Sequence, residues 1–168
     1  MAESSDNEIA GGIEPPEESD VPAIAGLFEQ DMVSLGLDVD TEALVDLAGY
    51  IVRDMHRDPP EALCWVARPG AGAEPVGVVV ANFNWSLKFA GRALWIEELF
   101  VDPEARRQGL GRALVDRVVD YAETHDIRGI DLEAYQGNTP ASVLYRTAGF
   151  HRLGRERFYY RVDDEEYL

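Results

Sequence analysis

The chain has 168 residues, 46% of them hydrophobic, which suits one domain with a full-sized core better than two small domains. Its 32 acidic residues against 15 basic ones give a formal net charge of -17, and this negative field argues against nucleic acid or an anionic membrane as partners. No apolar stretch approaches the roughly 20 residues of a membrane span, and the acidic N-terminus does not resemble a signal peptide, so we expect a cytoplasmic protein.

The first part of the chain predicts a tail, a short strand and a helix. Residues 1–8 are rich in Ser, Asp, Glu and Asn, so we expect a flexible acidic tail there and one folded domain over 9–168. A short strand is expected at 9–14, where two prolines follow. Ser19 or Asp20 can then cap a helix. Its apolar face combines Val21, Ile24, Leu27, Phe28 and Met32.

A second helix and three strands follow. The stretch 38–41 can cap a helix that ends before Pro59 and Pro60. Its apolar residues recur at helical spacing: Leu44, Leu47, Ala48, Ile51 and Met55. The pattern then changes to that of strands, which we expect at 63–67, 76–83 and 94–101, with a loop at 85–91.

The last part predicts alternating helices and strands. We expect a long helix at 108–124, a strand at 130–134, a short helix at 140–147 and a terminal hairpin over 150–162. The whole order of elements is typical of a single α/β domain with a mixed central sheet and about four flanking helices.

The stretch 101–112 is the most informative part of the sequence. A strand runs into a turn with Gly109 and Gly111, and the turn opens into an amphipathic helix, so backbone N–H groups at the positive end of the helix dipole can bind an anion. The nearby arginines add charge. Leu114 stands where a dinucleotide fold needs a third glycine, and no P-loop Lys-Ser/Thr pair is present. The pattern therefore predicts another kind of diphosphate ligand, with a tight turn that binds nothing as the alternative.

Two motifs in this order resemble those of the GCN5-related N-acetyltransferase (GNAT) superfamily. Arg106-x-x-Gly109-x-Gly111 matches its pyrophosphate motif, Arg/Gln-x-x-Gly-x-Gly/Ala. The second signature, which includes Asn138, Ala141, Leu144, Tyr145, Gly149 and Phe150, follows about thirty residues downstream. The resemblance covers roughly 9–162. It implies a sheet splayed between its fourth and fifth strands, with acetyl-CoA as cosubstrate in the gap.

The resemblance also implies which residues hold acetyl-CoA. Backbone groups of the fourth strand would pair with the pantetheine amides, the glycine turn would hold the diphosphate, and the second signature would contact the cofactor arm. In chain order these residues are Leu99, Phe100, Val101, Arg106, Arg107, Gln108, Gly109, Leu110, Gly111, Arg112, Asn138 and Tyr145. Asn138 is also expected to cap the helix that follows it.

The implied transfer needs a base and an acid. Three carboxylates are candidates for the base. Glu97 is ranked first, because polyamine acetyltransferases carry a glutamate in a similar strand. Glu133 is second, because it matches the proposed base of ribosomal-protein N-terminal acetyltransferases, and Glu98 is third. In a regular strand Glu97 and Glu98 point to opposite faces. Tyr145 is the expected acid, with core packing as the alternative. Cys64 is expected to be a buried core residue and not a nucleophile.

The sequence leaves the acceptor and the assembly open. Trp85-Ser86-Leu87 resembles the aromatic loop of diamine and polyamine acetyltransferases, whereas 131–138 is closer to peptide N-terminal and generic members. We expect a small cationic amine, with a peptide acceptor or a non-catalytic acyl-CoA-binding module as alternatives. A homodimer is expected from the family, and no metal site is expected because the single cysteine and the scattered histidines lack ligand spacing.

The excess of acidic residues also bears on the salt concentration at which the protein works. Lys88 is the only lysine, and all other basic residues are arginine. Repulsion among the carboxylates is screened at molar salt, where the Debye length falls to about 3 Å. We therefore expect a halophilic protein from a salt-in cytoplasm, with an ordinary acidic protein from an arginine-favouring genome as the alternative.

Overall fold

The computed structural model describes residues 12–135, 137–160 and 162. The expected tail at 1–8 and the first half of the expected strand at 9–14 lie outside these residues. The rest of that strand is confirmed as β1.

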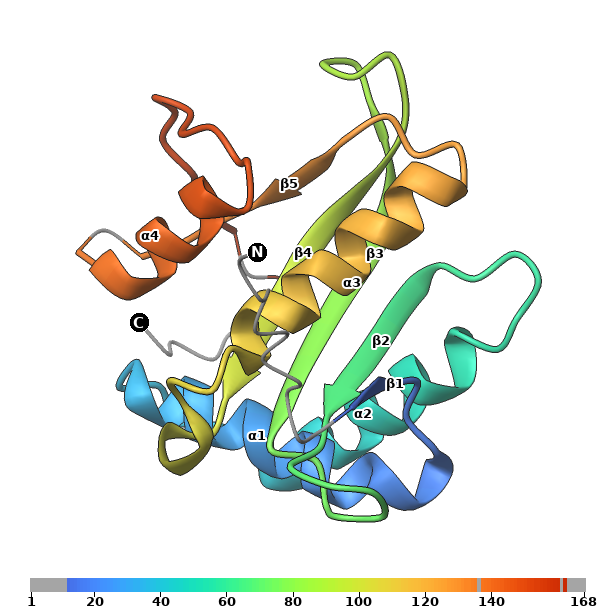
Figure 1. Ribbon diagram of the computed structural model, residues 1–168, viewed down its shortest axis with the longest axis vertical. Coiled ribbons are helices and arrows are strands. Elements are labelled where there is room, and N and C mark those ends of the chain that lie inside the picture. Colours follow the sequence, from blue (N-terminus) through green and yellow to red (C-terminus); the bar gives the residue numbers. More distant parts are fainter. Residues whose placement is uncertain (1–11, 136, 161, 163–168) are drawn as a thin grey trace, which may run out of the picture.

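The described chain contains five strands and four α-helices, besides two short 3-10 helices at Glu18–Asp20 and Pro103–Ala105 (Figure 1). In chain order they are β1 (Ile13–Glu14), α1 (Val21–Ser34), α2 (Thr41–Asp54), β2 (Ala62–Ala67), β3 (Gly77–Ser86), β4 (Gly91–Val101), α3 (Leu110–Thr124), β5 (Ile130–Leu132) and α4 (Thr139–Thr147). The sheet has the order β1-β2-β3-β4-β5, antiparallel except for the parallel pair β4–β5. The predicted single α/β domain with a mixed sheet is confirmed.

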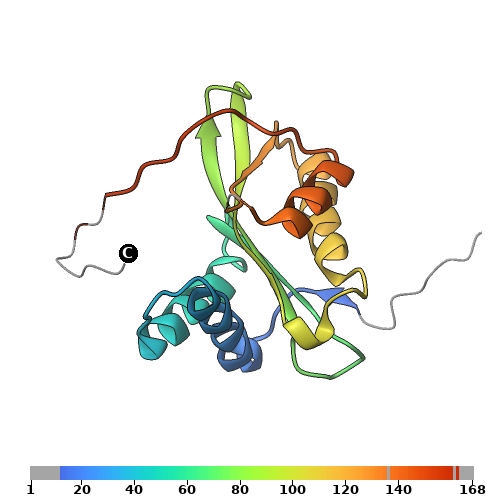
Figure 2. The ribbon, with the colours of Figure 1, turned by 90° about the vertical axis from the view of Figure 1, so that its left-hand side faces the viewer.

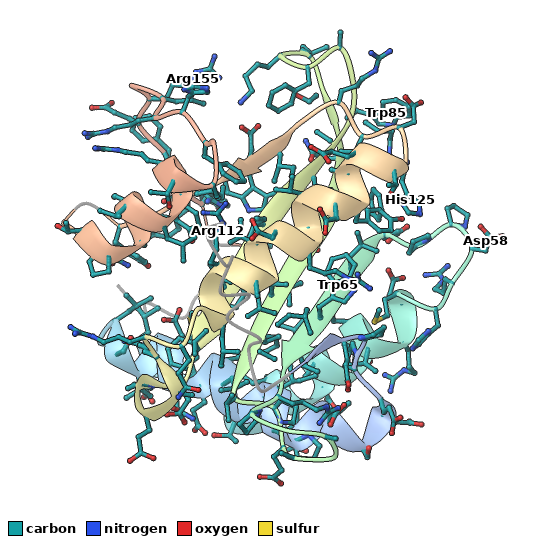
Figure 3. The ribbon with its side chains drawn as sticks, in the orientation of Figure 1. Asp58, Trp65, Trp85, Arg112, His125 and Arg155 are labelled. Carbon is teal, nitrogen blue, oxygen red and sulfur yellow. The ribbon has the colours of Figure 1, made fainter. Side chains whose placement is uncertain are left out.

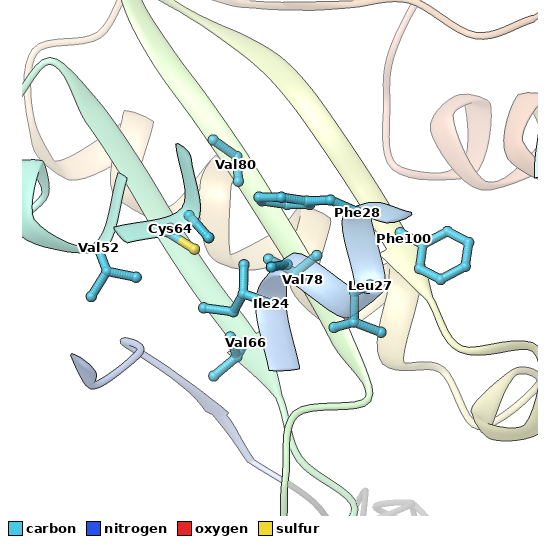
Figure 4. Close-up of a cluster of buried hydrophobic side chains, with 11 residues drawn as sticks. Ile24, Leu27, Phe28, Val52, Cys64, Val66, Val78, Val80 and Phe100 are labelled. Atoms are coloured by element: carbon cyan, nitrogen blue, oxygen red, sulfur yellow. The ribbon is translucent and has the colours of Figure 1, made fainter. Parts of the chain in front are cut away.

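The sheet separates two helical layers. Figure 2 shows α1 and α2 on one side of it, with α3 and α4 on the other. Alternate residues of β2 divide between the layers, because successive side chains of a strand point to opposite faces. Cys64 and Val66 pack with Ile24 and Phe28 under α1 and α2 (Figure 4), whereas Leu63 and the other odd-numbered positions pack under α3. Burial raises the pKa of the Cys64 thiol to about 12, in keeping with a core residue.

A β-bulge in β4 shifts this alternation. The register passes from Val80↔Glu98 directly to Ala81↔Ile96, so Glu97 has no direct partner on β3. Before the bulge Ile96 packs under α3, and after it Phe100 packs under α1 and α2. Glu98, opposite Val80, therefore lies on the α1 and α2 side of the sheet, a face that regular alternation from Ile96 would not give it.

Helix starts follow the predicted caps in two of three cases. The Asp40 carboxylate accepts the N–H groups of Glu42 and Ala43 at 2.9 and 3.2 Å, and so caps α2. Asn138 Oδ1 accepts the Ala141 N–H at 3.3 Å and caps α4. Asp20 precedes α1 but makes no side-chain cap bond, because its carboxylate binds elsewhere.

Arg68 ties β2 to the start of α1. Its guanidinium donates to Asp20 Oδ2 at 2.6 Å, to Glu14 Oε2 at 3.1 Å and to the Ala73 carbonyl at 2.7 Å. The Arg68 and Asp20 side chains are only 11% and 8% exposed. A buried carboxylate left without its partner is costly, so this pair holds the N-terminal part of the fold in place.

Arg68→Met should lower the free energy of unfolding by about 3 kcal/mol, because the Asp20 carboxylate stays buried without a counter-charge. Urea denaturation measures the change. Arg57→Met is the matched control: Arg57 pairs with Asp54 at 3.1 Å but is 67% exposed, and we expect less than about 1 kcal/mol. Equal losses of unfolding free energy in the two variants would contradict the stabilising role given to the buried Arg68–Asp20 pair.

Two expected boundaries are wrong. The expected loop at 85–91 is shorter, because Trp85 and Ser86 extend β3 and Gly91 begins β4, where cross-strand pairing continues to Ser86↔Gly91. The terminal hairpin is absent over the described residues 150–160, which contain no strand. Aromatic and β-branched residues favour a strand only where an edge is available to pair with, and β5 already ends at Leu132.

The segment 151–160 instead crosses the edge of the sheet. In Figure 2 it passes from the side of α4 toward the side of α1 and α2, and Figure 3 shows Arg155 on the loop above α4. Its aromatic side chains are exposed, Phe158 by 84% and Tyr160 by 90%. Its anchor is Arg157, which pairs with Glu133 and lies over the Trp95 ring, 4.6 Å from the centroid.

Candidate active site

The turn between β4 and α3 presents backbone N–H groups at the start of a helix. Arg107 and Gly109 adopt left-handed φ angles of 63° and 78°, which turn the chain into the first turn of α3. Within the described chain, the N–H groups of Leu110, Gly111 and Arg112 have no hydrogen-bond acceptor, as is usual for a first helical turn. Together with the helix dipole they form a site suited to an anion.

Gly111 also brings α3 and α4 together. A Cβ at this position would lie 3.3 Å from Leu144 Cδ1 and 3.9 Å from Val101 Cγ2. The first distance is tighter than an ordinary van der Waals contact. The glycine therefore sets how closely α4, and with it Tyr145, approaches the turn.

Protein groups orient the arginines at the two ends of the turn. Arg106 Nε donates to the Val101 carbonyl at 2.8 Å, and its guanidinium lies over the Phe100 ring, 5.4 Å from the centroid. Arg112 Nε pairs with Asp116 Oδ1 at 2.8 Å along α3. Each guanidinium has further N–H groups that can donate to a phosphate. Arg107 and Gln108 are exposed beside them.

The β4 strand continues past the end of β5. Parallel pairing joins 94–96 to 130–132, whereas β4 runs on to Val101. In Figure 1, β5 diverges from β4 toward α4. Among the described residues, no strand pairs with this edge of β4 beyond Ile96, so those of its N–H and C=O groups that no side chain engages are available to a ligand; the Val101 carbonyl already accepts Arg106 Nε. The half-buried Leu99 lies on this free stretch.

Glu98, Asp31 and Tyr145 lie near enough at this end of β4 for the charges of the two carboxylates to act on one another and on the tyrosine, and we call these three residues the carboxylate–tyrosine cluster. Burial raises the pKa of Glu98 to about 8; the charges of Asp31 and Glu97 add to the rise, and the Leu99 N–H, which donates to the carboxylate, opposes it. Burial also raises the pKa of Tyr145 to about 12, with further contributions from Glu98 and Asp31. The tyrosine hydroxyl is therefore protonated at neutral pH. Its ring packs edge-on against Phe150, 6.0 Å between centroids.

Asp31 is the member of the cluster that sequence reasoning missed. Burial raises its pKa, and the nearby Arg106 charge partly offsets the rise. The signal was present in the spacing of α1: Asp31 follows Ile24, Leu27 and Phe28 at helical intervals, so it lies on the apolar face that packs on the sheet. A carboxylate on an inward face is a candidate for function.

The other two predicted bases lie in different surroundings. Glu97 is exposed and occupies the bulge. Glu133 is exposed just after β5 and forms an ion pair with Arg157. The structure thus brings Glu98 and Tyr145 together, whereas Glu133 is engaged by the segment 151–160.

Most of this chain matches a known protein family. A model of the acetyltransferase (GNAT) family matches residues 24–150. The chain belongs to the GNAT family. The match begins within α1 and extends past the end of α4, so the glycine turn and the Tyr145 helix both lie inside the GNAT domain.

Two relatives share part of the sequence. An uncharacterized N-acetyltransferase of Methanocaldococcus jannaschii is 35% identical over 78 residues, which cover 46% of this chain and 34% of the relative. The ribosomal protein bS18-alanine N-acetyltransferase of Escherichia coli is 39% identical over 64 residues, or 38% of this chain and 43% of the relative. The chain thus spans less than half the length of these curated relatives.

Solved structures show the same fold over most of the chain. A predicted acetyltransferase from Clostridium acetobutylicum, crystallised with acetyl-CoA, aligns with a TM-score of 0.69 at 15% identity, covering 89% of this chain and 96% of that one. At such identity the likeness shows the GNAT fold alone.

Two features of other protein classes are absent from the described part of the chain. Over residues 12–135, 137–160 and 162, no group of three or more His, Cys, Asp or Glu side chains could hold a metal ion. None of the described helices is both long and apolar enough to cross a membrane.

Proposed function

We propose that this GNAT protein transfers the acetyl group of acetyl-CoA directly to a primary amine of a small cationic molecule, such as a polyamine. The observation that carries the proposal is the position of the carboxylate–tyrosine cluster at the free end of β4. A carboxylate with a raised pKa and a protonated phenol are the base and the acid that amine acetylation needs.

The groups around the β4–α3 turn fit the cosubstrate. Acetyl-CoA supplies an activated acetyl group when bound. The N–H groups at 110–112 suit its diphosphate. The edge of β4 at 99–101, with no described strand beside it, suits the amides of its pantetheine arm at the groups that Arg106 and Glu98 leave unoccupied. Gly109 supports this fit because its left-handed φ is costly for a residue with a Cβ.

Glu98 and Tyr145 divide the proton transfers. The ionised Glu98 carboxylate accepts a proton from the acceptor ammonium, directly or through one water, and leaves a neutral amine as the nucleophile. As the new C–N bond forms and the thioester C–S bond breaks, the Tyr145 hydroxyl donates its proton to the departing sulfur. The second proton that leaves the acceptor nitrogen passes through water to the tyrosinate and restores the neutral hydroxyl. Glu97 and Glu133 remain the alternative bases, and the carboxylate whose removal flattens the pH profile identifies the group.

The charge around the cluster supports a cationic acceptor. Asp31 and Glu98 interact within the cluster, and Glu97 lies next to them on the bulge. A site lined by carboxylates in a chain of net charge -17 attracts cations and raises their local concentration. The aromatic loop does not add to this argument, since Trp85 pairs with Arg92, which lies six residues before Glu98 along β4, roughly 20 Å in an extended strand.

A protein N-terminus is the second candidate acceptor. The likeness to the bS18-alanine N-acetyltransferase favours it. So does the segment 151–160, because Arg157 holds it next to Glu133 and Trp95, where a peptide could lie along it. A peptide acceptor would use the same base and acid.

Acetyl-CoA-dependent release of free thiol tests the proposal. The assay is run in molar KCl with polyamines, aminoglycosides, amino acids and short peptides as acceptors. Turnover confined to small polycationic amines is the expected result, and turnover confined to peptides would move the assignment to the second candidate. No turnover with any acceptor, while acetyl-CoA still raises the melting temperature, would overturn the small-amine proposal in favour of a binding role.

A further inference from the structure

An open groove of about 760 Å³ lies on the opposite side of β4 from β5. It is bounded by the C-terminal half of α2, the start of β2 and the end of β3, and Figure 3 shows Trp85 beside the β3–β4 hairpin. The β2 strand begins opposite Asn82, so the last residues of β3 have no β2 partner. None of the residues that line the groove belongs to the carboxylate–tyrosine cluster or to the glycine turn.

Aromatic rings form two walls of this groove. Tyr50 on α2 is 65% exposed and Trp85 on β3 is 77% exposed. Phe83 also lines the groove and packs edge-on against Tyr121 behind it, 6.2 Å between centroids. Large aromatic side chains are normally buried, and exposed rings gathered in a concave site indicate a ligand surface.

Two arginines stand over these rings. The Arg53 guanidinium lies 5.2 Å from the centroid of Tyr50, and that of Arg92 lies 4.9 Å from Phe83 and 5.5 Å from Trp85. Among the described residues, neither arginine forms a salt bridge with a carboxylate, although the chain has more than twice as many acidic as basic residues. A guanidinium stacked on a ring keeps its N–H edge free for a planar anion.

The carboxylates of the groove do not neutralise this pair of arginines. Asp54 accepts the N–H groups of Glu61 and Ala62, both at 2.8 Å, and pairs with Arg57 at 3.1 Å. Glu61 is the other lining carboxylate, and it is exposed. Three arginines and two carboxylates thus line the groove, a local excess of positive charge on a strongly negative protein.

We propose that this groove binds a small aromatic anion, with the ring against the exposed Trp85 and a carboxylate or phosphate on Arg92, while Tyr50 and Arg53 form the facing wall. Arginine and aromatic side chains together recognise a planar ring that carries a negative charge. The site stands independently of acetyl transfer, since none of its lining residues belongs to the cluster or to the glycine turn, and Arg92 precedes Glu98 by six residues along β4.

Titration of the full chain with phenylphosphate and phenylacetate tests this site. The indole N–H signals of the three tryptophans are followed by NMR at one fixed salt concentration, and Trp85→Phe assigns the reporter while it keeps a ring. We expect saturable binding that shifts the Trp85 signal, and the tighter of the two probes identifies the preferred anionic group. No saturable shift with either probe up to millimolar concentrations would overturn the proposal.

Two comparisons separate a specific site from general charge attraction. The double variant Arg53→Gln/Arg92→Gln should weaken binding by at least about tenfold, whereas Arg117→Gln should leave it unchanged. Arg117 is the matched control because it stacks on Trp65, 5.9 Å from the centroid, and does not line the groove. Inorganic phosphate that binds as tightly as phenylphosphate, or equal losses in both variants, would also overturn the proposal.

Discussion

Glu98→Gln should lower kcat by about two to three orders of magnitude, because it removes the group that takes the proton from the acceptor ammonium. The substitution keeps the size of the side chain, so acetyl-CoA should bind nearly as before. Steady-state kinetics over a range of pH measure the change. In the natural protein kcat/KM should rise with pH toward a plateau above about 8, where Glu98 is ionised, and this dependence should be lost in the variant.

The same substitution should stabilise the fold at alkaline pH. The pKa of Glu98 is about 8 in the folded protein against an ordinary value of 4.5, so between these values the folded state holds a proton that the unfolded chain has released. Stability from this group is therefore complete below 4.5 and is lost as pH rises through 8. The upper bound of the loss is about 5 kcal/mol, and the glutamine, which does not titrate, avoids it.

Glu97→Gln is the matched control for both effects. It removes the same charge one residue away, from an exposed side chain in the bulge. Urea unfolding of the three proteins at pH 5.5 and 8.5 should show the alkaline gain mainly in Glu98→Gln. A larger loss of kcat in Glu97→Gln would assign the base to Glu97 and contradict the role of Glu98 as proton acceptor.

Local patterns in the sequence are sufficient to predict most of the fold. The change from helical to strand spacing after α2 places β2, the expected cap within 38–41 includes the observed cap Asp40 of α2, and the cap at Asn138 places the start of α4 to within a residue. These signals act over one or two turns of chain, where propensity and side-chain capping dominate. The glycine turn before α3 belongs to the same class, since its φ angles are a local requirement.

The parts that could not be predicted depend on contacts between distant residues. The bulge at Glu97 arises from the register between β3 and β4, and without it Glu98 could not be placed in the same cluster as Asp31. Residues 150–160 have strong strand formers but pair with no strand, which sequence spacing does not reveal. The choice among three candidate glutamates therefore depended on burial, and not on the residue type.

Tyr145→Phe should lower kcat by about two orders of magnitude and leave the KM for acetyl-CoA nearly unchanged. The Tyr145 hydroxyl, with its pKa raised to about 12 by burial and by Glu98 and Asp31, stays protonated at working pH and can donate to the departing sulfur. The phenylalanine keeps the ring contact with Phe150, so the fold should be retained. Thiol release and acetyl-CoA-dependent thermal stabilisation measure the two effects separately.

Tyr121→Phe separates loss of the acid from loss of any buried hydroxyl. Tyr121 lies on α3, packed against Trp65 and Phe83, and burial raises its pKa as well. It lines neither the glycine turn nor the cluster, so its variant should keep full activity. If Tyr145→Phe also keeps full activity, the proton on the leaving sulfur comes from water, and the raised pKa of Tyr145 reflects packing of α4 against the cluster instead of catalysis.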